Sequence, residues 1–369
     1  MKVGIISTWR ARCGICTYAS FLGEELVKQG VDVTILAEKS SVLPKGIDPD
    51  FSSPLPYKEC WDRTKDFSEL LKVVETEKFD VIHIQHQFGL FPFFETTKSL
   101  LQGLKSIGVK IVITLHDVIP FDPQMGDYFT TILYHADKVI VHTPTCYRLL
   151  VVEWNCPPEK IVLILHGTKI VPVPTKQEAR KQLDLPQDAK IILSWGFVWE
   201  SKGIIELVEI LQQLLKDDPK TMLIHAGGLH PVFARGDYLR RILTTAFKMG
   251  IRPEQFKITG FIDEEKIKQY FGACDLIVLN YARGSASASG AAHRALAASK
   301  PIVGTDDPCI EEIPKFTVPR QDKTALYKGI KEVLNSPERQ KELVEKINTV
   351  AKETSWEVIA TKHIQLYKS

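Results

Sequence analysis

Residues 80–117, DVIHIQHQFGLFPFFETTKSLLQGLKSIGVKIVITLHD, show the pattern that decides the fold of this 369-residue chain. Two continuous apolar runs rich in β-branched residues, DVIHIQH (80–86) and KIVITLH (110–116), flank a helical segment. Such runs are typical of strands covered on both faces, which favours a parallel sheet with helices on either side.

Similar runs recur through the rest of the chain. In the first half they are VGIIST (3–8), VDVTILA (31–37), KVIVHT (138–143) and IVLILHG (161–167); in the second half they are KIILSWGF (190–197), TMLIHAGG (221–228), FKITGF (256–261), DLIVLNY (275–281) and KPIVGTD (300–306). Residues 168–189, rich in proline and charge, predict a linker with a short helix. We therefore expect two doubly wound α/β domains, with a ligand site in the cleft between them.

Composition and charge disfavour several classes of protein. The net charge is only +2, from 47 Lys and Arg against 45 Asp and Glu, so bulk charge favours neither nucleic acid nor an anionic membrane. No apolar run approaches the roughly 20 residues that a membrane span needs, and residues 1–14 lack the apolar stretch of a signal peptide. We expect a cytoplasmic protein, at most associated with the inner face of the membrane. The seven scattered cysteines do not suggest a disulfide framework.

The stretch WRARCGICTYASFL (9–22) carries a C-x-x-C pair, Cys13 and Cys16. A structural zinc site needs about four ligands, and the chain has no second such pair. A redox pair is another interpretation, because a helix N-terminus lowers a thiol pKa. The third needs only Gly14, since a glycine between a strand and a helix lets backbone N–H groups face an anion. We favour the glycine turn, with the cysteines as small fillers.

Two later stretches have the pattern of anion sites. In SWGFVWESKG (194–203), Lys202 lies between a strand end and a helix, where lysine can hold phosphate as a point charge; a solvated surface lysine is the alternative. In GSASASGAA (284–292), small residues lead into a helix whose N-terminus would bind an anion, unless the segment is a flexible linker. The residues concerned are Ser287, Ser289, Gly290 and Ala291.

Histidines and phenylalanines gather at predicted strand ends of the first half. The histidines are His86, His116 and His166. Ligand binding at the sheet edge competes with packing for each of them. The phenylalanines are Phe88, Phe91, Phe93 and Phe94. For these, core packing competes with an apolar acceptor surface or a weak membrane-facing loop. The chain has neither a G-x-G-x-x-G nor a G-x-x-x-x-G-K-[ST] motif, which disfavours dehydrogenase and P-loop function.

Taken in order along the chain, these motifs resemble the retaining glycosyltransferases of family 4, which have the GT-B fold of two Rossmann-like domains. RCGICTYASFL resembles the glycine-rich first loop, and QHQFGLF, TLHD and ILHG resemble strand ends of the N-terminal domain. WGFVWESKG resembles the donor-phosphate loop, and ITGFIDEEKIKQYFGACDLIVLNY the base-binding segment. The resemblance implies an acceptor domain over 1–170, a donor domain over 171–353 and a helix over 354–369 that returns to the first domain.

The resemblance also implies roles for individual residues. His116 would contact the transferred sugar of a UDP- or GDP-linked donor. The donor itself would meet Gly14, Gly196, Lys202, Gly260, Phe261, Ile262, Ser289, Gly290 and Ala291. Lysine and helix N–H groups would stabilise the leaving diphosphate in place of a metal ion, so we expect no cofactor.

The chain departs from the family pattern at three positions. The family carries two glutamates eight positions apart, where this sequence has Ala286 and Arg294, and Phe197 replaces an arginine near the phosphate lysine. Arg283 or Arg294 would supply the missing positive charge. The sequence thus predicts a glycosyltransferase that acts on a glycan or lipid-linked acceptor. A silent GT-B subunit, a GT-B nucleotide-sugar epimerase and a C-x-x-C redox protein are the alternatives.

Overall fold

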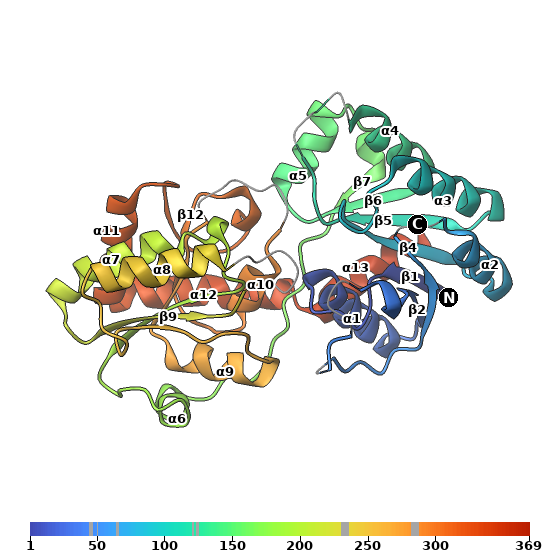
Figure 1. Ribbon diagram of the computed structural model, residues 1–369. Helices are drawn as coiled ribbons and strands as arrows, with labels where there is room; N and C mark the ends of the chain where they lie inside the picture. The colour runs from blue at the N-terminus through green and yellow to red at the C-terminus, as the bar shows by residue number, and fades with distance from the viewer. Residues whose placement is uncertain are drawn as a thin grey trace. The chain divides into compact units, whose positions relative to one another are not determined.

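The chain folds into two compact α/β units, each with its own sheet (Figure 1). Unit 1 is formed mainly by Met1–Gly167 and Thr354–Ser369, and unit 2 mainly by Thr168–Ser285 and Ala291–Glu353. The computed structural model describes residues 1–369 except 44–46, 50, 64–65, 120–121, 123–124, 230–235 and 282–287, and residues 264 and 265 without their side chains.

The sheet of unit 1 has seven strands, all parallel, in the order β3-β2-β1-β4-β5-β6-β7. They are β1 (Lys2–Ser7), β2 (Asp32–Glu38), β3 (Tyr57–Trp61), β4 (Val81–His86), β5 (Lys110–Leu115), β6 (Lys138–Val141) and β7 (Ile161–Leu163). The predicted parallel sheet is thus confirmed. The strand order reverses between β1 and β4, and doubly wound sheets bind ligands at the carboxyl ends of the strands at such a point.

Helices cover both faces of this sheet. Side chains of α2 (Ser68–Glu77), α3 (Phe94–Ile107) and α4 (Gly126–His135) pack on one face, together with the short α5 (Pro144–Arg148). Those of α1 (Gly14–Lys28) and α13 (Trp356–Lys368) pack on the other. Within β4, Ile82 and Ile84 join the first cluster and Val81 the second, because successive side chains of a strand point to opposite faces.

Unit 2 repeats this plan with six parallel strands in the order β10-β9-β8-β11-β12-β13. They are β8 (Lys190–Trp195), β9 (Thr221–Ala226), β10 (Phe256–Ile258), β11 (Leu276–Leu279), β12 (Ile302–Thr305) and β13 (Phe316–Val318). One face is covered by α7 (Ile204–Asp217), α8 (Asp237–Lys248) and α11 (Lys323–Asn335), the other by α6 (Lys176–Gln182), α9 (Glu264–Ala273) and α10 (Gly290–Leu296), with α12 (Pro337–Glu353) following α11. The order reverses between β8 and β11.

Two strands, β3 and β13, lack a clear signal in the sequence. Each is short and lies at the edge of its sheet, and Tyr57, Lys58 and Glu59 of β3 are exposed. An edge strand is only partly covered, so it does not need the continuous apolar run that marks a central strand.

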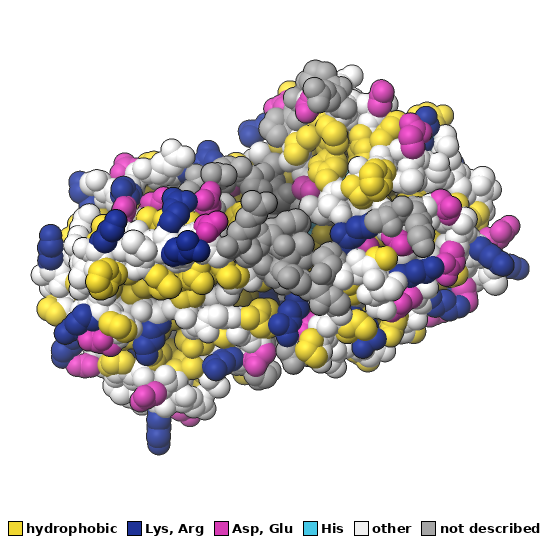
Figure 2. Space-filling model, viewed as in Figure 1, with side chains coloured by type: hydrophobic (Ala, Val, Ile, Leu, Met, Phe, Trp, Pro, Cys, Tyr) yellow, Lys and Arg dark blue, Asp and Glu magenta, His cyan; other side chains and the backbone are white. Residues whose placement is uncertain are grey.

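The charges on the surface and the apolar content of the helices are those expected from a sequence with a small net charge and no long apolar run. On the face that Figure 2 shows, Lys and Arg side chains are interspersed with Asp and Glu side chains. Across the described part of the chain, no helix combines the length and the apolar character that crossing a membrane requires.

Candidate functional site

The loop after β8 lies where the strand order of unit 2 reverses. Gly196 adopts a φ of +117°, and a Cβ on Gly227 would lie only 1.8 Å from the Gly196 carbonyl oxygen. A short 3-10 turn then ends at Lys202, and Asn280 donates from Nδ2 to the carbonyl of Gly203 over 2.8 Å. Glycines that permit close backbone contact, together with one side-chain hydrogen bond, therefore fix the loop that carries Lys202.

Lys202 is held against an aromatic ring. Its Nζ lies 3.6 Å from the centre of the Tyr281 ring, a cation–π contact, and no carboxylate of the described residues forms an ion pair with it. Burial lowers the pKa of Lys202 to about 8, although Cys309 and Asp307 act in the opposite direction. A desolvated cation without an ionic partner is suited to bind an anion such as phosphate.

A second cation lies near this loop, on α10. The Arg294 guanidinium carbon is 4.9 Å from the centre of the Trp195 ring, and the Trp195 Nε1 donates to the Ala291 carbonyl over 2.7 Å. A Cβ on Gly196 would lie 3.6 Å from the Ala291 Cβ and 3.9 Å from the Lys202 Cε. The structure of unit 2 thus brings together Gly196, Lys202 and Ala291, and Arg294 lies over the ring of Trp195, which directly precedes Gly196. Trp195 and Tyr281, whose rings contact the two cations, were not predicted to do so, although each lies in a strand-like run of the sequence.

The loop after β10 exposes an aromatic side chain. Gly260 adopts a φ of +75°, Phe261 is 49% exposed and Ile262 packs against the core of unit 2. A Cβ on Gly228, just past β9, would lie 2.6 Å from the backbone nitrogen of Phe261. This close approach holds the loop, and the exposed ring offers a face on which a planar group such as a nucleobase can stack.

The remaining predicted donor residues of the second half are placed only in part. Gly290 is the first residue of α10 and Ser289 directly precedes it. Arg283, Ser287 and Ala286 lie outside the described residues. Phe197, where the family pattern has arginine, is partly buried directly after Gly196.

In unit 1 the C-x-x-C pair caps a helix. Cys13 is the N-cap of α1, and its Sγ accepts from the Cys16 amide over 3.4 Å. Both cysteines are free, and burial raises the pKa of each thiol, so neither is a thiolate at neutral pH. The described residues contain no group of three or more His, Cys, Asp and Glu side chains that could hold a metal ion. These facts favour the glycine turn over the redox interpretation; Gly14 is exposed, and a Cβ there would meet nothing within 4 Å.

The ring of Tyr18, on α1, contacts three histidines at the carboxyl ends of the strands of unit 1. Its ring centre lies 4.8 Å from that of His116 and 5.2 Å from those of His142 and His166. His116 Nε2 forms a 2.8 Å hydrogen bond with Gln85 Oε1, an atom that only accepts, and burial lowers the pKa of His116 well below the usual value. Two predicted histidines are therefore neighbours, and His142 and Tyr18 join them without having been predicted.

His86 is a core residue, which corrects its place among the candidate site residues. It is 2% exposed, its ring stacks on Phe91 with centres 5.3 Å apart, and its Nε2 forms a 2.9 Å hydrogen bond with the Tyr128 hydroxyl. Burial lowers its pKa to about 3, so the ring is neutral at physiological pH. At this strand end, the His86 side chain packs in the core of unit 1 against Phe91 and Tyr128.

The phenylalanine cluster divides between core and surface. Phe91 is 2% exposed and stacks on Trp61, with ring centres 5.6 Å apart, so the prediction of a membrane-facing role is wrong for Phe91. Phe88 and Phe94 pack partly against the same core, whereas Phe93 is 52% exposed. Core packing accounts for most of this stretch because the chain turns back into α3 directly after β4.

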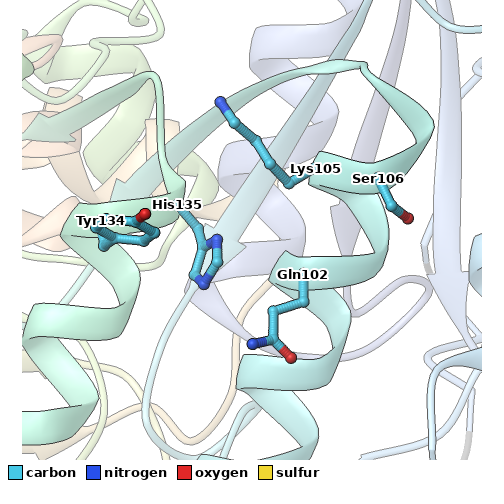
Figure 3. A pocket seen from close by; sticks show the side chains of 5 residues that line it. All are labelled: Gln102, Lys105, Ser106, Tyr134 and His135. Atoms are coloured by element: carbon cyan, nitrogen blue, oxygen red, sulfur yellow. The ribbon is translucent and has the colours of Figure 1, made fainter.

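A surface hollow of about 480 Å³ lies between α3 and α4, lined by Gln102, Lys105, Ser106, Tyr134 and His135 (Figure 3). Its residues come from the last turns of the two helices, just before β5 and β6 begin. It therefore lies at the amino ends of the strands, at the opposite edge of the sheet from His116.

Comparison with known proteins places the two units in one class. The Glycosyltransferase Family 4 description matches residues 13–170 and the Glycosyl transferases group 1 description matches residues 175–350. The structure of Anabaena HepE in complex with UDP aligns over 100% of both chains with a TM-score of 0.79 at 15% identity. The chain has the GT-B fold and belongs to the family 4, group 1 glycosyltransferases.

Curated relatives share more of their sequence with this chain but align over a smaller part of it. The teichuronic acid biosynthesis glycosyltransferase TuaC of Bacillus subtilis is 28% identical over 36% of this chain and 28% of its own length. The alpha-monoglucosyldiacylglycerol synthase of Streptococcus pneumoniae is 22% identical over 81% of this chain and 69% of its own. The chain spans less than half the length of three of the curated relatives it matches, namely 28%, 34% and 40%.

Proposed function

We propose that this protein transfers a sugar from a nucleotide-sugar donor to a glycan or lipid-linked acceptor, with retention of configuration and without a metal ion. The observation that carries this proposal is Lys202: a partly buried cation with a lowered pKa, no ionic partner among the described residues and a place at the carboxyl edge of its sheet. A site that keeps such a charge desolvated favours an anion over water.

The chemistry of unit 2 supports a nucleoside diphosphate as the anionic part of the donor. Lys202 and Arg294 supply two positive charges near Gly196, which suits a diphosphate. The exposed ring of Phe261 would stack on the base. UDP is the first nucleotide to test, because the structure of HepE has been solved in complex with UDP. The names of TuaC and of the S. pneumoniae synthase point to glycan and lipid acceptors respectively.

In this proposal the two cations do the work that a metal ion does in many transferases. Negative charge builds up on the leaving diphosphate as the sugar–phosphate bond breaks, and fixed positive charges in a site of low polarity stabilise it. In unit 1, His116 would contact the transferred sugar. No side chain is assigned as a nucleophile.

A binding subunit without turnover is the second candidate function. Arg294 stands where the family pattern has a glutamate, and its guanidinium is seated over Trp195. The charge at this position is thus reversed, which would alter contacts to the sugar or ribose. Release of nucleoside diphosphate by the purified protein separates the two functions, and product formed without an acceptor would indicate an epimerase instead.

The first test is a thermal-shift screen against UDP, GDP, ADP and dTDP, with magnesium or with EDTA. A ligand at about 100 times its dissociation constant adds roughly 2.7 kcal/mol, a rise of a few degrees in Tm. We expect one base to stabilise the protein equally with and without metal. The response should be lost in Lys202→Ala and kept in Lys248→Ala, a matched change of an exposed lysine of unit 2. No response to any nucleotide, or an unchanged response in Lys202→Ala, would overturn the donor site.

A further inference from the structure

Strand β4 carries two polar side chains into an otherwise apolar interface. His83 and Gln85 are both 0% exposed and lie two residues apart, so they point to the same face of the sheet. That face packs against α1 and α13, as the neighbouring Val81 shows. Burying such groups is costly unless each is hydrogen-bonded, so their partners determine what they do.

The partners form one chain of hydrogen bonds. His116 Nε2 lies 2.8 Å from Gln85 Oε1, and Gln85 Nε2 lies 3.2 Å from His83 Nε2. His83 Nε2 also lies 2.7 Å from the Thr114 hydroxyl. On its other side, His83 Nδ1 lies 2.7 Å from the hydroxyl of Tyr367, on the last helix of the chain. The chain runs from α13 through the sheet to the carboxyl end of β5.

The chemistry of the amide gives this chain a direction. A carbonyl oxygen only accepts, so Gln85 Oε1 requires a proton on His116 Nε2. An amide NH₂ only donates, so His83 Nε2 is an acceptor and the proton of His83 sits on Nδ1, from which it is donated to Tyr367. Burial lowers the pKa of both histidines well below the usual value, so each ring carries one proton, as this scheme needs.

We propose that Gln85 is a positioning residue that holds His116 as its Nε2–H tautomer and leaves Nδ1 as an atom that only accepts hydrogen bonds. The other ring nitrogen, Nδ1, has no hydrogen-bond partner within the described ranges, and His116 is only partly buried. The consequence for the substrate rests on the proposed function: His116 selects a sugar that presents a hydroxyl group to the Nδ1 atom. A carboxylate at the same place, as in a uronic acid, would meet a lone pair instead of a donor.

The tautomer can be measured without any ligand or activity. The full-length protein labelled with ¹⁵N-histidine gives a long-range ¹H–¹⁵N spectrum in which protonated and bare ring nitrogens are clearly separated, and His116→Asn assigns the signals. We expect His116 to show a protonated Nε2 and a bare Nδ1, and His83 the reverse. A protonated Nδ1 on His116, or an averaged mixture of the two forms, would overturn the proposal.

Variants at position 85 separate positioning from simple packing. Gln85→Leu keeps the volume but removes the acceptor, so we expect the His116 signals to move toward a mixture of tautomers. Gln85→Glu restores an acceptor and should restore the Nε2–H form. Gln102→Leu, the same change on the outer surface of α3, should leave the His116 signals where they are. Equal signals in all three variants would show that Gln85 does not set the tautomer, and the unmodified protein alone still tests the scheme if a variant does not fold.

Kinetics test the consequence for the donor. With donors that carry the nucleotide found in the thermal-shift screen, the unmodified protein should use a neutral hexose donor better than the matching uronic acid donor. Gln85→Leu should raise the donor KM by roughly two- to tenfold, which is the contribution of one neutral hydrogen bond. A preference for the uronic acid donor would overturn the selectivity. Failure of all nucleotides to bind would instead overturn the proposed function, while the tautomer measurement would still stand or fall by itself.

Discussion

At the scale of single residues, the site of unit 2 holds the Lys202 cation on an aromatic ring, and no carboxylate of the described residues forms an ion pair with it. Lys202 lies over Tyr281 and Arg294 over Trp195. A ring face offsets part of the desolvation cost of a cation but does not neutralise its charge. A carboxylate partner would compete with a phosphate for the same cation. This arrangement therefore keeps positive charge available to an anionic ligand.

The lowered pKa of Lys202 predicts how nucleotide affinity depends on pH. The ammonium form binds the diphosphate, and with a pKa of about 8 in the free protein it is lost as pH rises through 8. We expect the affinity for the responding nucleotide to be steady near pH 7 and to fall by up to about tenfold per pH unit above 8. Isothermal titration between pH 7 and 9.5 measures this.

Lys202→Arg is the control for that pH profile, because a guanidinium stays protonated across the whole range. The variant should bind with an affinity that stays level up to pH 9.5. A steep loss of affinity in both proteins would mean that another group is responsible.

At the scale of elements, the last helix completes the core of unit 1. Trp356 of α13 is 5% exposed, and a Cβ on Gly167 would lie 2.3 Å from its ring. Lys110 at the start of β5 donates from Nζ to the carbonyls of Leu366 and Tyr367, each over 3.1 Å. The sheet face between α1 and α13 would be open to water if this helix were absent.

Removing the Trp356 side chain should therefore destabilise unit 1. We expect Trp356→Ala to cost about 3–5 kcal/mol of unfolding free energy, the range for a large aromatic side chain in a core. Tyr134→Ala removes a ring that is 77% exposed in the same unit and should change stability by less than about 0.5 kcal/mol. Urea unfolding followed by circular dichroism gives both values. Equal effects of the two changes would contradict the role of α13 in this core.

At the scale of the whole molecule, burial lowers the pKa of more histidines in the described part of unit 1 than in that of unit 2. In unit 1, burial lowers the pKa of His86 to about 3 and of His363 to about 4, and lowers those of His83 and His116 well below the usual value. In unit 2, burial lowers that of His225 to about 4.

Acid should therefore destabilise unit 1 before unit 2. Between pH 6.5 and the folded-state pKa values, the unfolded chain binds protons that the folded chain does not, so stability is full above 6.5 and is lost as pH falls. Each such histidine contributes up to about 1.4 kcal/mol of loss per pH unit in this window. Hydrogen exchange read by mass spectrometry at pH 7.5 and 5.5, corrected for the intrinsic exchange rate, should show protection lost first in peptides of unit 1. Loss that begins in unit 2 would contradict this.

The class of fold could be predicted from the sequence, and the sequence also proposes candidate site residues. Continuous apolar runs identify central strands, because only strands covered on both faces need them. Lys202 and His116 could be predicted because each follows such a strand, and parallel strands bring their carboxyl ends to one edge. These signals are local, so a single chain displays them. The edge strands β3 and β13 display no such signal.

Which groups at those strand ends are buried in the core and which are not depends on the tertiary structure. His86 and His116 end neighbouring strands, yet one stacks on Phe91 in the core and the other lies beside Tyr18. The chain of hydrogen bonds through Gln85 depends on Tyr367, which is 284 positions from its partner His83. Hydrogen bonds and burial depend on distances in space, and the folding of the last helix onto the first sheet sets those distances.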